Sequence, residues 1–204
     1  MIDVYDNILE KHDAVTIDYE IKKLKWSYDY QYTTKKLNKQ WYVMCGKNDE
    51  ECRQSNYPWA PEIFNIIINK PDIKNKYNIE RYFSLYCIAY TYGTEQQIHT
   101  DDGDLTMLYY PTLDWKLDWG GGTAIYNEIT NDYINHGKYM QLDKDNNADI
   151  DKYVAYKGNR LVIFDAFLPH QGQPISKQCH ELRTVVVFKC VVEGGNLERL
   201  DYYK

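Results

Sequence analysis

Short runs of β-branched and aromatic residues, separated by turn residues, dominate the second half of this chain and limit the folds open to it. The runs begin near residue 80 and read RYFSLYCIAYTY, LTMLYYPTL, TAIYN, YVAY, NRLVIFDAF and LRTVVVFKCVV. The connections between them include WGGGT and YKGNR, which contain the glycines typical of turns. Several short strands at fairly regular spacing predict a sandwich or jelly roll instead of alternating βαβ units.

The first part of the chain shows a different pattern. Apolar positions in the first 25 residues fit a short strand followed by a helix. Residues 60–70, APEIFNIIINK, have a proline near the start and clustered Ile and Phe side chains, which predicts a packed helix. Residues 26–59 are polar and aromatic without clean periodicity. Two interpretations of them stay open, a lid over a substrate or aromatic side chains packed on the outside of the barrel.

The domain organisation follows from these two parts. No Pro/Gly/Ser-rich linker divides the 204 residues, so we expect one domain over residues 1–204. Its class is mainly β with N-terminal helices (α+β), built on a double-stranded β-helix, or jelly roll. We expect a helical or lid-forming part over 1–79, the jelly-roll core over 80–192 and a C-terminal tail over 193–204.

Charge and cysteine content exclude several classes of partner. The net charge is −6, and no block of Lys or Arg is long enough to neutralise a row of phosphates, so nucleic acid and anionic membranes are disfavoured. The five cysteines form no Cys-x-x-Cys pair and are odd in number, which indicates reduced, mostly buried thiols. The N-terminus lacks the pattern of a signal peptide, and the apolar runs are too short for a bilayer. We therefore expect the cytoplasm, or the host cytoplasm if the chain is viral; no pattern indicates an oligomeric state.

The hexapeptide IHTDDG places His99 two residues before Asp101. With five His and 19 Asp in 204 residues, such a pair is expected about half a time by chance, so it is weak on its own. If the segment is extended, both side chains point to one face, because side chains alternate along a strand. Two imidazoles and one carboxylate suit Fe(II) and leave coordination positions open for other ligands. His170 and His180 are the candidates for the third ligand.

Four blocks of sequence resemble, in order, the prolyl 4-hydroxylase-like family of Fe(II)/2-oxoglutarate oxygenases. The run YTYGTEQQIHTD resembles the metal-binding entry of that family, and LYYP resembles its tyrosine-bearing strand. WGGGTAIYN is similar to the Gly-Gly turn before an apolar strand. GNRLVIFDAFLPHQGQP, followed by LRTVVVF, is similar to the distal histidine and the basic residue on the last core strand. The resemblance covers roughly residues 80–190.

The resemblance implies a ligand set for the metal. It assigns Fe(II) to His99, Asp101 and His170, because His170 directly follows an apolar run whereas His180 does not. Fe(II) and 2-oxoglutarate are the implied cofactor and cosubstrate, with ascorbate as a reductant.

The same resemblance implies that Arg183 binds the far carboxylate of 2-oxoglutarate, with Tyr110 as a second donor and Tyr90 lining the pocket. Alternation in ELRTVVVFK points Arg183 inward with two valines, where an unpaired charge is costly and a guanidinium suits a carboxylate. The sequence departs from the pattern of the family at two points. Arg183 follows His170 by thirteen positions where the family has nearer ten, and Gly122 stands where the family often has an acidic residue.

The implied activity is hydroxylation of a proline residue in a protein or peptide, with release of succinate and CO2. One rival is an oxygenase of the same mechanism that acts on a free amino acid or another small molecule. A nucleic-acid demethylase is disfavoured, since the resembling proteins carry a second arginine where this chain has Lys189. The remaining alternative is a jelly roll that binds without catalysis.

Overall fold

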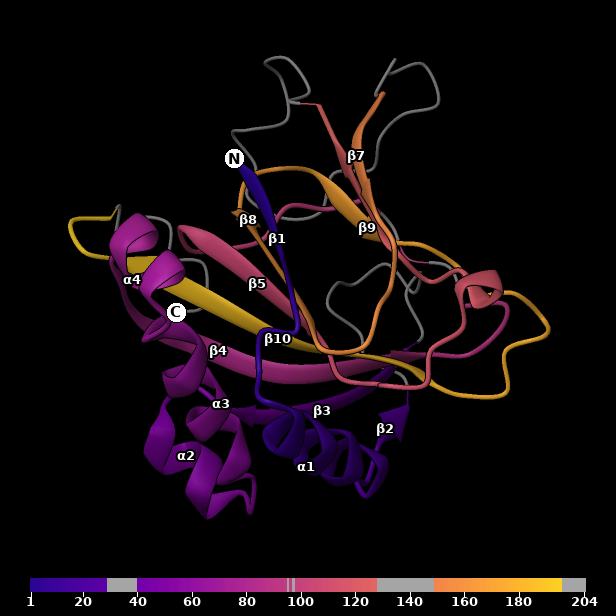
Figure 1. Cartoon of the computed structure of the whole chain (residues 1–204), viewed down its shortest axis with the longest axis horizontal. Coiled ribbons are helices and arrows are strands. Elements are labelled where there is room, and N and C mark those ends of the chain that lie inside the picture. The colour runs from indigo at the N-terminus through magenta and orange to yellow at the C-terminus, as the bar shows by residue number, and fades with distance from the viewer. Residues whose placement is uncertain (29–39, 95, 97, 128–148, 196–204) are drawn as a thin grey trace.

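A computed structural model describes residues 1–28, 40–94, 96, 98–127 and 149–195. Its strands form two facing antiparallel sheets, and its helices cover the outer face of the larger sheet (Figure 1). The larger sheet has seven strands in the order β1-β8-β5-β10-β4-β3-β2, and the smaller has three in the order β7-β6-β9. The strands are β1 (Ile2–Asp6), β2 (Ser27–Tyr28), β3 (Trp41–Gly46), β4 (Ile79–Tyr90), β5 (Leu105–Tyr110), β6 (Thr123–Tyr126), β7 (Ile150–Val154), β8 (Arg160–Asp165), β9 (His170–Gly172) and β10 (Arg183–Val192).

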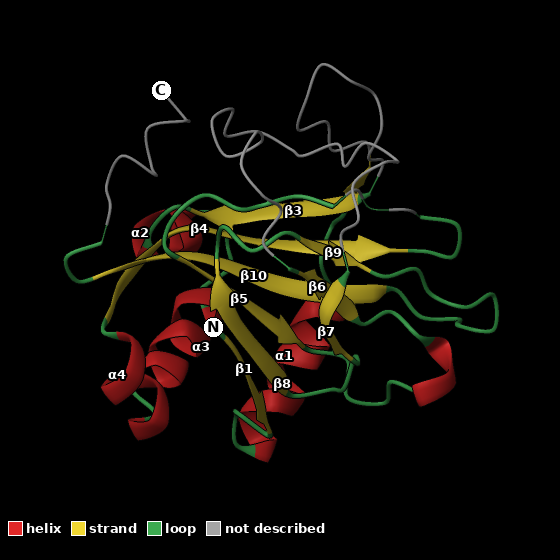
Figure 2. Cartoon of the chain, turned by 90° about the horizontal axis from the view of Figure 1, so that it is seen from above, coloured by secondary structure: helices red, strands yellow, loops and turns green. Residues whose placement is uncertain are grey.

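Four helices lie on one side of the larger sheet (Figure 2). Their bounds are α1 (Lys11–Lys22), α2 (Asp49–Gln54), α3 (Trp59–Ile68) and α4 (Pro71–Tyr77), and a 3-10 turn, η1, covers Leu117–Trp119. The strand and helix expected within the first 25 residues are therefore present, as is the helix expected over 60–70. Within the described ranges, no helix has both the length and the apolar character needed to cross a membrane.

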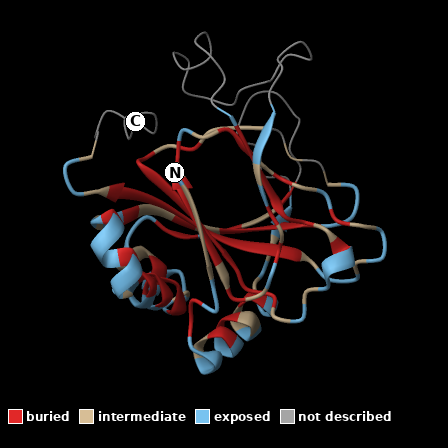
Figure 3. Cartoon of the chain, turned by 45° about the horizontal axis from the view of Figure 1, so that its top comes forward, coloured by how far each residue is buried: buried red, intermediate tan, exposed pale blue. Residues whose placement is uncertain are grey.

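The central strand β10 shows why the sequence from residue 183 on is almost continuously apolar. Both of its faces are covered, and nine of its ten residues are buried (Figure 3). Val186 and Phe188 point into the core beneath the helices, whereas Val185 and Val187 point into the second core, between the two sheets. Every second side chain of β10 therefore lines the space between the two sheets, and the others face the helices.

The N-terminal part also contributes to the sheets. β1 pairs with β8, and β3 pairs with β4, so strands from before residue 80 flank the core strands on both sides. Of the segment 26–59, β3 and α2 pack as part of the sheet and its helical cover, while residues 29–39 lie outside the described residues, so the lid interpretation stays a prediction there. The mainly β class with N-terminal helices and a jelly-roll core is confirmed. Four of the five cysteines are buried and all five are free thiols, as expected.

Candidate metal centre and anion pocket

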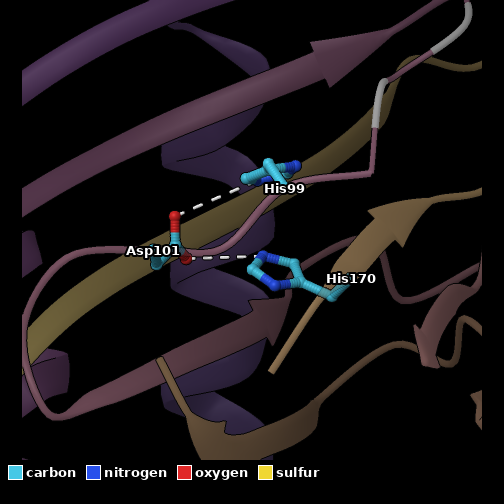
Figure 4. A group of neighbouring side chains, drawn as sticks. All are labelled: His99, Asp101 and His170. Atoms are coloured by element: carbon cyan, nitrogen blue, oxygen red, sulfur yellow. Dashed lines mark ion pairs between the residues drawn. The ribbon is translucent and has the colours of Figure 1, made fainter. Parts of the chain in front are cut away.

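Three side chains from two distant segments lie close to one another (Figure 4). His99 and Asp101 lie in the connection from β4 to β5, and His170 is the first residue of β9. Their candidate ligand atoms all lie within 4.8 Å of one another. Among the described residues, this is the one group of three or more His, Cys, Asp and Glu side chains so placed.

Backbone hydrogen bonds hold these segments together. The amide of His99 donates to the carbonyl of His170 at 3.0 Å, and the amide of His170 donates back to His99 at 2.8 Å. The amide of Asp101 donates to the carbonyl of Ala166 at 2.7 Å. The isolated bridge between the histidines brings their rings to a centroid distance of 4.4 Å. The pairing of β9 with the segment around His99 therefore brings His170 next to His99 and Asp101.

Two of the ligands are oriented by further contacts. The Nδ1 of His170 lies 2.9 Å from the carbonyl oxygen of Leu168. Because a carbonyl can only accept, Nδ1 carries the proton, and the lone pair of Nε2 is left for a metal. Asp101 receives a 2.7 Å hydrogen bond at Oδ2 from the hydroxyl of Thr106, and its Oδ1 lies 3.2 Å from Nζ of Lys189. Burial alone would raise the pKa of Asp101, but the charge of Lys189 holds this pKa well below its usual value.

A buried guanidinium lies in the same cavity. Arg183, the first residue of β10, is 1% exposed and lines the cavity together with the three candidate ligands. Its Nε donates to the carbonyl of Gly121, and its Nη2 donates to the carbonyl of Gly122 at 3.2 Å. The carbonyls can approach because Gly121 has a φ of 75°, where a Cβ would lie 3.1 Å from Cδ of Arg183. The WGGGT turn thus binds the arginine directly.

Two buried donors in this cavity lack a protein acceptor. Nη1 of Arg183 and the hydroxyl of Tyr90 are inaccessible to water and have no hydrogen-bond partner among the described residues. The guanidinium carbon lies 4.9 Å from the centre of the Tyr90 ring, and the two residues are paired in the β10–β4 register. Buried donors are normally satisfied. An acidic ligand that accepts from both would remove the deficit, which is the fit that a bound carboxylate requires.

The glycine carbonyls leave one guanidinium nitrogen for a ligand. Gly121 and Gly122 accept from Nε and Nη2, and Nη1 has no acceptor among the described residues, so the role of Arg183 in binding a carboxylate stays a prediction. The second unsatisfied donor is Tyr90. Tyr110, the predicted second donor, has its hydroxyl 2.7 Å from the Thr123 hydroxyl, and its role in binding a carboxylate stays a prediction.

The wall between the metal group and Arg183 is largely apolar. Ile88, Leu108, Val185 and Val187 line it, and all four are buried. His180, the rejected candidate ligand, is exposed and lies against the ring of Trp119 instead. The structure therefore brings His99, Asp101, His170, Arg183 and Tyr90 to one cavity.

Two residues of the site had no predicted role there. Thr106 and Lys189 both contact the Asp101 carboxylate. A signal for Lys189 existed, because it continues the inward alternation of Arg183, Val185 and Val187 by one more step. Thr106 gave no comparable signal, since its contact with Asp101 forms only because the β4–β5 connection folds back onto β5.

Comparison with known proteins supports the fold through structure alone. No protein-family model matches the chain, and no curated protein sequence matches it. A prolyl hydroxylase from Trichoplax adhaerens, solved with a hypoxia inducible factor peptide fragment, is 12% identical with a TM-score of 0.59 and covers 100% of this chain and 87% of its own. A Pseudomonas putida prolyl-4-hydroxylase is 12% identical with a TM-score of 0.60, covering 94% of this chain and 92% of its own.

A third similar structure performs different chemistry. SnoN, a non-heme alpha ketoglutarate dependent epimerase from nogalamycin biosynthesis, is 12% identical with a TM-score of 0.60 and covers 92% of this chain and 78% of its own. At such low identity these matches establish a shared arrangement of strands and helices and nothing finer. By fold, this chain is a double-stranded β-helix protein whose arrangement of strands and helices is similar to that of these prolyl hydroxylases.

Proposed function

We propose that this protein is an Fe(II)- and 2-oxoglutarate-dependent oxygenase that hydroxylates a proline residue in a protein or peptide, in the cytoplasm. The observation that carries the proposal is the pairing of two features in one cavity. One is the His99, Asp101 and His170 group, and the other is the buried guanidinium of Arg183 with an unsatisfied nitrogen. A metal group alone fits many proteins, whereas a metal group and an anion site joined by an apolar wall fit a dicarboxylate that also reaches the metal.

Each group of residues has a distinct task in the proposed reaction. His99, Asp101 and His170 would hold the ion, while Nη1 of Arg183 and the Tyr90 hydroxyl would bind the far carboxylate of 2-oxoglutarate. The apolar wall would exclude water from the space between them. When bound, iron and 2-oxoglutarate would allow O2 to act as the oxidant, with one oxygen atom entering the hydroxylated product and the other entering succinate as 2-oxoglutarate loses CO2.

The assay for the reaction class measures succinate. The protein is incubated with Fe(II), 2-oxoglutarate, ascorbate and air, and succinate is quantified. His99→Ala, Asp101→Ala and His170→Ala should each abolish its formation, because each removes one ligand of the ion. His180→Ala is the matched control and should keep wild-type turnover. Succinate formation that survives all three ligand substitutions would refute the site, and a wild-type protein that binds neither iron nor cosubstrate would indicate a non-catalytic jelly roll.

The substrate needs a separate test. The order and spacing of the motifs support a prolyl substrate, and one structural neighbour holds a peptide fragment. Proline-containing peptides are incubated with the enzyme, and mass spectrometry searches for a product that has gained one oxygen. The gain should be lost when the proline of a modified peptide is replaced by alanine.

The alternative is an oxygenase of the same mechanism that acts on a free amino acid or another small molecule. SnoN, which has the same TM-score as the bacterial prolyl-4-hydroxylase, shows that the fold does not separate the two. Oxygen gain by free small molecules, with none in any peptide, would favour this alternative.

A further inference from the structure

Lys189 is a buried cation near the candidate metal ligands. It lies on β10 six residues beyond Arg183, on the same inward face, and is 4% exposed. Its Nζ lies 3.2 Å from Oδ1 of Asp101 and 3.6 Å from Oδ2 of Asp102. The β10–β4 register shifts immediately after Lys189, at an irregularity of the kind that re-aims side chains beside functional sites. Burying an ammonium costs free energy unless acidic partners lie close to it, so the contact with Asp101 is needed to keep Lys189 buried.

Thr106 completes the arrangement from the neighbouring strand. The β10–β5 register pairs Lys189 directly with Thr106, which is fully buried. The Thr106 hydroxyl donates to Oδ2 of Asp101 at 2.7 Å, while Lys189 contacts Oδ1. One cross-strand pair therefore presents one donor to each oxygen of the same carboxylate. With the backbone amide of Asp101 bound to Ala166, both ends of the residue are fixed.

We propose that Lys189 and Thr106 are positioning residues that hold the Asp101 carboxylate toward the two imidazoles before a metal binds. The proposal rests on the metal site of the proposed function. The two donors differ in charge, so their effects on the two oxygens differ. The Lys189 ammonium disfavours a second cation on Oδ1, whereas the neutral Thr106 hydroxyl leaves Oδ2 able to bind one, which is the oxygen 3.4 Å from Nε2 of His170. Ligation through one oxygen keeps other coordination positions open for a cosubstrate.

The test measures metal affinity without turnover. Co(II) is titrated calorimetrically into the metal-free protein, and the d–d absorption spectrum of the complex reports its coordination. Lys189→Met and Thr106→Val should each weaken Co(II) binding about tenfold or more, as is typical when the groups that orient a ligand are removed. Thr106→Val changes no charge, so its loss of affinity reports orientation alone. Lys189→Arg keeps the charge and the donors and should restore most of the affinity.

The matched control variants change residues that do not contact His99, Asp101 or His170. Thr112→Val removes another buried threonine hydroxyl, which contacts Thr184, and Lys152→Met removes a lysine that donates to the carbonyl of Ile2. Both should bind Co(II) with wild-type affinity and spectrum. Wild-type affinity in either folded Lys189→Met or folded Thr106→Val overturns the positioning role while leaving the proposed function intact. Should Lys189→Met fail to fold, Thr106→Val decides. Absence of Co(II) binding by the wild-type protein would overturn the metal site itself, and the positioning role with it.

Discussion

At the scale of single residues, the best-determined feature of the cavity is the orientation of Arg183. Its guanidinium is hydrogen-bonded to the carbonyls of Gly121 and Gly122 and lies near the faces of Tyr90, Tyr110 and Tyr156. Aromatic faces attract cations, and no acidic side chain among the described residues pairs with the guanidinium. The arginine therefore keeps its charge available to an anion in the cavity.

Replacing Arg183 tests this availability. Arg183→Gln should weaken 2-oxoglutarate binding by about 2 kcal/mol, roughly 30-fold, because a charge-assisted hydrogen bond contributes in this range. Calorimetry with the Co(II)-loaded protein measures the affinity, and circular dichroism checks that the variant is folded. Arg160→Gln is the control, since Arg160 is bonded to Asp6 at the sheet edge. An unchanged affinity in Arg183→Gln would assign the cosubstrate carboxylate to another base.

At the scale of elements, the edge strand β1 is attached to the molecule by charged contacts at both ends. Asp3 is hydrogen-bonded to Lys76 and Tyr77 of α4. At the other end, Asp6 accepts from Nε of Arg160 at 2.6 Å and from Nζ of Lys157 at 2.8 Å. These contacts attach both ends of β1 to neighbouring elements and support its register with β8.

The pH dependence of stability tests the attachment at Asp6. Hydrogen bonding to Arg160, opposed by burial, lowers the pKa of Asp6 from 3.8 to about 2. A pKa that is lower in the folded state means that the stabilisation is present above about pH 4 and is lost as pH falls toward 2. Because the side chain is 37% exposed, solvent screening limits the effect to about 1 kcal/mol. Urea denaturation should show Asp6→Asn less stable than wild type by this amount at pH 7, with the difference shrinking steadily below pH 4. A difference that is independent of pH would contradict the assignment.

The elements that the sequence predicted are those whose local pattern decides their structure. β4, β5, β8 and β10 carry long apolar or aromatic runs, and each was expected from residue composition alone. β9 was not expected as a strand, since His170–Gly172 is short and polar and becomes extended by pairing with β6 and with His99. β3 was missed for another reason, because its aromatic and apolar run lies within the segment 26–59, which shows no clean periodicity as a whole.

The candidate site divides in the same way. His99, Asp101 and His170 were identifiable because motif order and spacing are written along the chain. The contact of Lys189 with Asp101 depends on the register between β10 and β5, which are more than 70 residues apart in sequence, and the contact of Thr106 depends on how the β4–β5 connection folds back onto β5. A single sequence does not encode register in any local pattern. The partners of a ligand are therefore harder to predict than the ligand.

At the scale of the whole molecule, the candidate metal group links the two sheets. His170 belongs to the three-stranded sheet, whereas Asp101 contacts Thr106 and Lys189 of the seven-stranded sheet. An ion held by His99, Asp101 and His170 would join the two sheets. Ligands that bind only the folded state stabilise it by mass action.

Thermal unfolding measures this coupling. Free Mn(II) at about 100 times its dissociation constant should stabilise the protein by about 2.7 kcal/mol. For a chain of this size the melting temperature should rise by roughly 5–10 °C, and EDTA should reverse the rise. His99→Ala and His170→Ala should show no such increase, whereas His180→Ala should respond as wild type does. Equal increases in all four proteins would mean that Mn(II) acts elsewhere.

The glycine carbonyls that hold Arg183 have one more consequence. Main-chain atoms move less than side chains, so the span from the guanidinium to the metal group is set by the scaffold. Under the proposed function, the cavity would then select 2-oxo diacids by their length. A diacid one methylene shorter would fall short of one end, and a longer one would have to bend against the valine and leucine wall. Cosubstrate choice by chain length would thus be decided by a turn of three glycines.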